Sequence, residues 1–215
     1  FHFLSSIVKN MSLKQLFFKN KFIILLLFIV FLLRLPSLFE PYWYGDENIY
    51  LTMGMGIRKG FLLYRDIFDN KPPVIYLLAS LANGSIFWFK FILLVSTLTA
   101  TLFFYRLVKT IFGKHGKAIA VGTIIFSLLI TLPLIEGNIV NAELFILLPV
   151  ISGFYLFFNK NTKKTRLLPL FIGIVFSIGF LLKVPAVFDF LTLLVFTTFF
   201  SETNKRICFK EQTLF

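Results

Sequence analysis

The residues best suited to chemistry gather in one stretch of the chain, from Gly45 to Tyr76. It is the only long segment in which charged side chains interrupt otherwise apolar sequence. Its charged residues are Asp46, Glu47, Arg58, Lys59, Arg65, Asp66, Asp69 and Lys71. Adjacent carboxylates repel each other, so one member of the Asp46–Glu47 pair is expected to have a raised pKa. A carboxylate at the edge of a helix bundle can accept a proton from a hydroxyl group, which makes this pair a candidate general base.

A candidate cation lies in the same stretch, at Lys71, directly before Pro72 and Pro73. Proline is tolerated in the first turn of a helix, so we expect a helix to start here and to hold Lys71 at its N-terminal end. A lipid phosphate needs such a cation, and the helix dipole would add to the attraction. A lysine that only extends to the membrane surface would leave the same pattern, so both interpretations stay open.

Aromatic residues flank the two carboxylates, at Tyr42, Trp43, Tyr44 and Tyr50. Sugar rings stack on such side chains. Aromatic side chains also gather at any membrane–water interface. The aromatic cluster alone therefore does not distinguish a sugar site from an interfacial belt.

Two further segments carry polar groups between apolar runs. Asn141 can cap a helix whose first turn holds Glu143, and Glu143 would face the same side of the membrane as Asp46. Lys183 follows a long apolar run. An ionisable residue in a membrane segment is a functional candidate by default, although Lys183 could equally anchor a helix end. Asp189 could pair with Lys183 across a short turn.

The composition places the chain in a membrane. The 215 residues are 58% hydrophobic and 15% charged, against about 25% charged in soluble domains. The net charge of +12 would suggest nucleic-acid binding in a soluble protein. Here the basic residues lie at the ends of apolar runs, a pattern typical of membrane orientation. We therefore expect membrane lipids as partners and no nucleic acid.

Metal and disulfide chemistry have little support in the sequence. Cys208 is the single cysteine, and the two histidines, His2 and His115, lie far apart. We predict no metal site of the histidine or cysteine type. A divalent cation held by carboxylates such as Asp46, Glu47 and Glu143 stays open as a cofactor.

The elements that must position these residues are apolar helices. Apolar runs predict about six transmembrane helices, over residues 19–39, 86–108, 118–135, 144–158, 167–182 and 186–200. The shorter apolar segment after Pro73 predicts an interfacial or re-entrant helix. Lys90 lies beside Trp88 near a helix start, where we expect it to act as an interfacial anchor.

Charge predicts how these helices are oriented. Basic turns at the N-terminus and at 106–117, 159–166 and 204–210 alternate with acidic or mixed turns at 40–85, 136–143 and 183–185. Because positive residues stay on the cytoplasmic side, we expect a multi-pass protein of the plasma (inner) membrane with a cytoplasmic N-terminus. The predicted parts are a cytoplasmic segment (1–18), a transmembrane module (19–200) with a first outer loop (40–85), and a cytoplasmic tail (201–215).

The order of these motifs resembles a known family. It runs through Arg34-Leu-Pro36, Gly45-Asp46-Glu47 with Tyr50, Asn70-Lys71-Pro72-Pro73 with Tyr76, Asn141-Ala-Glu143, and Leu182-Lys183-Val-Pro185. Over nearly all of residues 20–200 this order is similar to GT-C glycosyltransferases of the protein-mannosyltransferase and aminoarabinose-transferase type. The Asp-Glu pair and the Lys-Pro-Pro motif are its most specific parts. Because members of this type are longer, we expect this chain to be the N-terminal part of an enzyme whose donor and acceptor pockets it does not complete.

The resemblance implies an all-α, polytopic membrane helix bundle with juxtamembrane helices in its first outer loop. It implies a hexosyl- or pentosyltransferase that moves a sugar from a polyprenyl-phosphate donor to a protein, lipid or glycan acceptor, with inversion. The catalytic residues would be Asp46 and Glu47. The donor phosphate would meet Lys71, helped by Arg34 and Arg65. The sugar and acceptor candidates are Tyr50, Tyr76, Asn141, Glu143 and Lys183.

Two other classes of protein fit the same charge pattern less well. A transporter or flippase subunit would place ionisable groups near the bilayer midplane, whereas here they gather at one end of the predicted helices. A non-catalytic membrane scaffold remains compatible with the composition. Consumption of a lipid-linked sugar would separate the enzyme from both.

Overall fold

The computed structural model describes residues 20–42, 44–159 and 167–200. In these residues the chain is all-helical, with eight α-helices, two short 3-10 helices and no β-strand. In chain order the elements are α3 (Lys21–Arg34), η1 (Pro36–Phe39), α4 (Gly45–Arg58), α5 (Val74–Leu81), α6 (Ile86–Phe112), α7 (Gly116–Leu129), η2 (Pro133–Ile135), α8 (Ala142–Phe158), α9 (Leu168–Leu182) and α10 (Ala186–Phe200).

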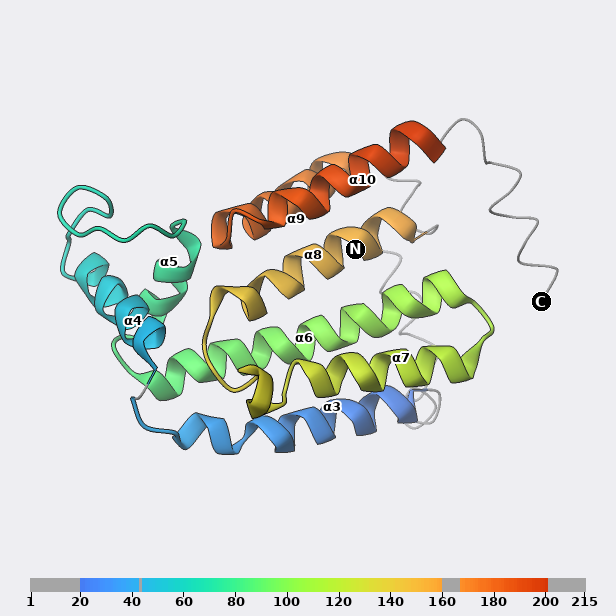
Figure 1. Cartoon of the computed structure of the whole chain (residues 1–215), viewed down its shortest axis with the longest axis horizontal. Helices are drawn as coiled ribbons and strands as arrows, with labels where there is room; N and C mark the ends of the chain where they lie inside the picture. Colours follow the sequence, from blue (N-terminus) through green and yellow to red (C-terminus); the bar gives the residue numbers. More distant parts are fainter. Residues whose placement is uncertain (1–19, 43, 160–166, 201–215) are drawn as a thin grey trace, which may run out of the picture.

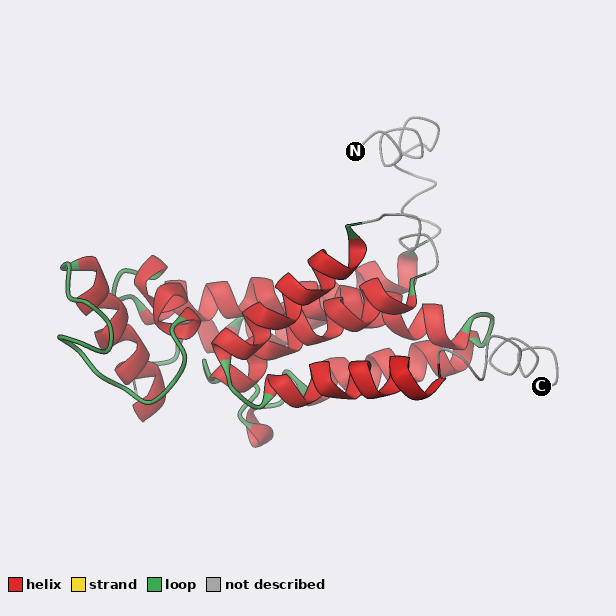
Figure 2. Ribbon diagram, turned by 90° about the horizontal axis from the view of Figure 1, so that it is seen from above, coloured by secondary structure: helices red, strands yellow, loops and turns green. Residues whose placement is uncertain are grey.

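Helices α3 and α6 to α10 form a bundle with roughly parallel axes, and α4 and α5 lie together at one end of it (Figure 1). Helix α6 is central and packs against α3, α7 and α8, while α9 packs against α8 and α10. Seen from above, α4, α5 and their connecting loop again extend beyond the bundle (Figure 2). This arrangement confirms the predicted all-α bundle with extra helices in the 40–85 loop.

Short polar residues and glycine set the ends of the bundle helices. The Ser85 side chain accepts a hydrogen bond from the Trp88 amide and caps α6 at its start. Gly113, at φ +58°, ends α6 in a backbone conformation that other residues rarely adopt. Asn141 caps α8 as predicted, with its Oδ1 atom 3.1 Å from the Leu144 amide nitrogen. These ends turn the chain back at alternating ends of the bundle.

The predicted helix over 118–135 is shorter than expected. Helix α7 ends at Leu129, and the chain reforms only the short η2 from Pro133. Proline lacks an amide hydrogen and disfavours helical backbone in the residue before it, so the apolar run cannot continue as one helix. The connection from here to Asn141 instead folds against α3 and α4.

The bundle exposes apolar side chains along its length. Lys21–Phe39 and Ile86–Phe112 are long and apolar enough to cross a membrane, and α7 to α10 are apolar but shorter, at 14 to 17 residues. Exposed apolar residues include Phe28, Val121, Phe171 and Leu194. Lipid can cover surfaces of this kind, whereas water would penalise them.

The main core lies at the α4–α5 end of the bundle. Tyr50, Ile75, Tyr76 and Phe89 are almost fully buried there, together with residues of α8 and α9. Gly54 lets α4 and α5 meet closely, because a Cβ atom at this position would lie 2.6 Å from the Ala79 carbonyl carbon. Close packing of this kind makes α4 and α5 a rigid platform for the charged residues that they carry.

Candidate active site

The first turn of α4 carries both carboxylates of the Asp-Glu pair. A helix N-terminus stabilises negative charge, which explains why two acidic residues can start this helix. Their side chains go different ways. The Asp46 side chain is 41% exposed at the end of the bundle, whereas that of Glu47 is 1% exposed.

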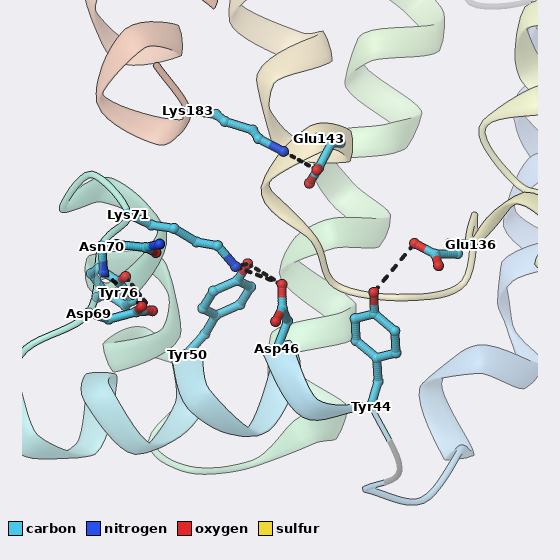
Figure 3. Close-up of polar contacts among 10 residues, drawn as sticks. All are labelled: Tyr44, Asp46, Tyr50, Asp69, Asn70, Lys71, Tyr76, Glu136, Glu143 and Lys183. Atoms are coloured by element: carbon cyan, nitrogen blue, oxygen red, sulfur yellow. Dashed lines mark hydrogen bonds and ion pairs between the residues drawn. The ribbon is translucent and has the colours of Figure 1, made fainter. Parts of the chain in front are cut away.

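Lys71 extends from the loop before α5 to Asp46 (Figure 3). Its Nζ atom lies 2.6 Å from the Asp46 Oδ2 atom, and it also donates to the Tyr50 hydroxyl. Tyr50, one turn further along α4, in turn donates to the same Asp46 oxygen at 3.1 Å. The ammonium also lies 4.5 Å from the centre of the Tyr50 ring, within the range of a cation–π interaction. A carboxylate, an ammonium and a phenol therefore form one hydrogen-bonded cluster.

The electrostatics of this cluster keep Asp46 ionised. The hydrogen bond from Lys71 is the main cause that lowers the pKa of the Asp46 carboxyl, and it outweighs partial burial, which acts in the opposite direction. The Tyr50 hydroxyl and the charge of Lys183 lower this pKa further. Burial and the neighbouring carboxylate raise the pKa of Tyr50, so its phenol stays protonated and can donate.

Hydrogen bonds within the 59–73 loop and to α5 hold Lys71 in place. The Tyr64 hydroxyl donates to the Lys71 carbonyl oxygen at 2.6 Å. Close to Lys71 in the chain, Asp69 accepts hydrogen bonds from the Tyr76 hydroxyl at 2.7 Å and from the Asn70 amide. Tyr76 is completely buried, so it serves this loop and presents no surface to a sugar.

A second ion pair lies at the same end of the bundle. Lys183, directly after α9, pairs with Glu143 in the first turn of α8 (Figure 3). The suggested pairing of Lys183 with Asp189 is therefore wrong: the lysine turns to α8 instead. Its charge acts on Asp46, and that of Glu143 acts on Tyr50, so the two ion pairs are electrostatically linked.

The other predicted site residues lie away from Lys71. The guanidinium of Arg34 is buried and donates to the backbone carbonyls of Ile130 and Gly137, so it ties α3 to the α7–α8 connection. Arg65 is exposed and pairs with its neighbour Asp66. Asn141 is occupied as a helix cap. Among the contacts of the described residues, none joins Arg34, Arg65 or Asn141 to Asp46.

The aromatic residues near the carboxylates have separate partners. The exposed Tyr42 donates to the Gly84 carbonyl oxygen and accepts from the Ile86 amide, which joins the start of α6 to the end of η1. The Tyr44 hydroxyl lies 3.5 Å from Glu136 (Figure 3). Trp43 is outside the described residues. Of these two, Tyr44 is the one that lies near Asp46 (Figure 3).

Glu47 belongs to a buried network that the sequence did not reveal. Its Oε1 atom accepts from the Val140 amide at 2.6 Å and lies 3.8 Å from the Lys90 ammonium. Lys90 also binds Glu40 at 2.7 Å, and Asn138 donates to both oxygens of Glu40. The expectation that Lys90 anchors a helix at the membrane surface is wrong, because its side chain is fully buried. The sequence did carry one signal for this network, because Lys90 is an ionisable residue within an apolar helix.

Glu47 does not face Asp46 and Glu143, the other two carboxylates that could have held a divalent cation. With Glu47 held by Val140 and Lys90, the three carboxylates of Asp46, Glu47 and Glu143 do not converge. Across the described part of the chain, no group of three His, Cys, Asp or Glu residues is placed to hold a metal ion. Asp46 and Glu143, the two of these three that are not buried, are each paired with a lysine instead.

Fold and composition define a helical membrane protein with a paired carboxylate and ammonium at one end of its bundle. Comparison with known proteins gives its family. Residues 70–215 match the dolichyl-phosphate-mannose-protein mannosyltransferase family, and the chain belongs to that family. It is thus a GT-C membrane glycosyltransferase that uses a lipid-linked sugar donor. No curated protein and no solved structure matches the chain significantly.

Proposed function

We propose that the chain transfers a sugar from a polyprenyl-phosphate donor to a protein, lipid or glycan acceptor at the outer face of the membrane, with inversion at the anomeric carbon. The observation that carries this proposal is the 2.6 Å contact between Lys71 and Asp46. If the donor phosphate binds at Lys71, the anomeric carbon of the donor sugar lies close to Asp46. The Asp46 carboxylate could then take the proton of the attacking hydroxyl or amine.

The separation of carboxylates from a purely basic end supports an orientation of the bundle. The start of α3, the end of α6 and the α6–α7 turn lie at the end opposite α4 and α5 (Figure 1). Their described residues include no carboxylate and five basic residues: Lys21, Arg106, Lys109, Lys114 and Lys117. The described carboxylates lie at the end that carries α4 and α5. If the basic end is cytoplasmic, Asp46 faces outside and the N-terminus lies inside. We extend this to a multi-pass protein of the plasma (inner) membrane.

In the proposed reaction, the acceptor O–H or N–H gives its proton to Asp46 as its heteroatom attacks the anomeric carbon. The bond between that carbon and the phosphate oxygen breaks, and its electron pair leaves with polyprenyl phosphate. Lys71 neutralises the charge that develops on this oxygen, which is the larger electrostatic demand. Because phosphate leaves without being protonated, one carboxylate suffices, unlike the two that glycosidases use.

The resting pair must separate for this to happen. While Lys71 holds Asp46, the carboxylate is a weak base, because its pKa is lowered. A donor phosphate would compete with Asp46 for the ammonium. Once Lys71 turns to the phosphate, the pKa of Asp46 rises and the carboxylate becomes the stronger base that the reaction needs. Sugar or acceptor hydroxyls would bind to Lys183 and Glu143, which pair at the same end of the bundle, and to Tyr44.

Turnover of a radiolabelled lipid-linked sugar by the purified protein tests the proposal. Asp46→Asn removes the base but keeps its size, and we expect turnover to fall by about 10²- to 10⁴-fold. Asp66→Asn is the matched control, since Asp66 lies in the exposed 59–73 loop, paired with Arg65. Wild-type turnover in Asp46→Asn would exclude Asp46 as the base. Absence of any sugar transfer by the wild-type protein would favour a transporter or a scaffold.

A further inference from the structure

The Lys90 network joins four separate segments of the chain. Lys90 lies in the second turn of α6 and binds Glu40, the residue that follows η1, at 2.7 Å. Its ammonium also lies 3.8 Å from Glu47 in the first turn of α4. The connection before α8 supplies the Asn138 side chain to Glu40 and the Val140 amide to Glu47. One buried cation therefore lies between two carboxylates that come from different elements.

Such a network is not needed to bury this surface. Desolvating a charge is costly, and an apolar side chain of similar volume often stabilises a core as well or better. Within the described residues, Glu47 Oε2 is also buried without a hydrogen-bond partner. Glu47 thus stays inside through one backbone hydrogen bond and the nearby charge of Lys90. What the charged groups add over an apolar contact is a defined direction for the carboxylates that they hold.

That direction matters because Glu47 is the residue after Asp46. Side chains of consecutive helix residues point about 100° apart around the axis. Glu47 is held inward by Lys90 and Val140, and rotation of the first turn of α4 would break both contacts. In the orientation held by these contacts, Asp46 lies beside Lys71 at the end of the bundle. A rotation that released Glu47 would move Asp46 away from the ammonium.

We propose that Lys90 is a positioning residue: by holding Glu47, it sets the rotation of α4 and thereby the place of the Asp46 carboxylate. This role rests on the proposed function of Asp46 as the base. Lys90 is buried and does not meet the sugar or the acceptor, so it acts on catalysis only through the helix that it orients.

The test is a double-mutant cycle between Lys90→Met and Asp46→Asn, with turnover expressed per folded molecule. Displacing a catalytic group by about 1 Å can lower the rate 10²-fold, so we expect Lys90→Met to reduce kcat by about 10- to 100-fold. The KM for the donor should not rise and should fall at most severalfold, because Lys71 belongs to another segment and only loses its competing carboxylate. In the Asp46→Asn background, Lys90→Met should cause no further loss, since residues that act as one unit are not additive.

Two further variants keep the proposal testable if Lys90→Met does not fold. Glu47→Gln keeps an oxygen for the Val140 amide but loses the charge that faces Lys90, and it should lower kcat in the same non-additive way. Lys90→Arg restores a cation and should recover part of the lost kcat. Lys114→Met, the same change at the exposed α6–α7 turn, should leave kcat unchanged.

Additive losses in the cycle, or wild-type kcat in both Lys90→Met and Glu47→Gln, would overturn the positioning role. If Asp46→Asn is inactive in the same assay, the proposed function survives that outcome. Wild-type turnover in Asp46→Asn would instead remove the proposed function, whatever the Lys90 variants do. The two failures are therefore distinguishable.

Discussion

The Nζ atom of Lys71 lies 2.6 Å from the Oδ2 atom of Asp46, although 25 residues separate the two in the chain. Neither side chain is deeply buried, at 26% and 41% exposed. A pair this exposed adds little to stability, because water screens it. Its value lies in chemistry, since it brings the candidate base and the candidate phosphate ligand into one hydrogen-bonded cluster.

The pair predicts two different pH profiles. In the free protein Lys71 lowers the pKa of Asp46, so the acid limb of kcat/KM should lie below the ordinary aspartate value. A bound phosphate neutralises Lys71 and adds negative charge, so the acid limb of kcat should lie at higher pH. Initial rates measured across pH at low and saturating donor would check this. Superimposable limbs would argue against the exchange of Lys71 between carboxylate and phosphate.

Asp46→Asn should bind the donor more tightly even though it transfers poorly. The substitution removes the carboxylate that competes with phosphate for Lys71. We expect the dissociation constant for polyprenyl phosphate to fall severalfold, which corresponds to the loss of an exposed ion pair of about 1 kcal/mol or less. Titration calorimetry in detergent would measure it. Weaker binding would mean that Asp46 itself contacts the ligand or supports its site.

Lys71→Met should raise the donor KM and also lower kcat. The ammonium would contact the phosphate in the ground state and more strongly as charge develops in the transition state. Removing one such group from an electrostatic site lowers kcat by about 10²- to 10³-fold. The matched control is Lys59→Met, at the exposed end of α4, which should behave as wild type. A loss of the same size in both variants would point to the net charge of this surface instead.

Gly54→Ala should destabilise the α4–α5 unit. Its methyl group would lie 2.6 Å from backbone atoms of Ala79 and Ser80, which cannot move aside as a side chain can. We expect a loss of about 1–3 kcal/mol, as in other overpacked cores. Thermal unfolding in detergent would report it. Gly122→Ala in α7, where a new Cβ meets nothing within 4 Å, is the control and should not lower the melting temperature.

Chelation of divalent cations should leave transfer unchanged. The exposed carboxylates Asp46 and Glu143 are each neutralised by a lysine, and Glu47 faces the core. A hard cation needs several converging oxygen ligands, which this arrangement does not offer. The measurement is turnover before and after EDTA, followed by addition of Mg²⁺ or Mn²⁺. A loss restored by metal would show that the carboxylates rearrange around a cation.

Much of the fold could be predicted because short-range sequence patterns are enough to identify membrane helices. The apolar runs, the cap at Asn141 and the proline start of α5 are short-range signals, and the structure has helices at all of these places. The end of α7 before Pro133 was missed because the apolar composition continues through the turn. Apolar content tells where a helix can lie in lipid, but not where its backbone hydrogen bonds stop.

The candidate site could likewise be predicted only in part. The types and order of residues singled out the Asp-Glu pair and the Lys-Pro-Pro motif. They could not tell which carboxylate turns outward, because Asp46 and Glu47 are neighbours with similar chemistry. The tertiary structure separates them: Lys90 and the Val140 amide draw Glu47 inward, and Lys71 meets Asp46 outside.

By itself, then, the sequence determined the class of protein, the helices and the set of groups available for chemistry. Only the tertiary structure decided the partners: Lys183 with Glu143 instead of Asp189, Arg34 with backbone carbonyls, and Lys90 between the buried Glu47 and the half-buried Glu40. The physical reason is the sequence distance over which each interaction acts. Helix formation and membrane preference depend on residues within a few turns, whereas an ion pair depends on where packing brings distant segments together.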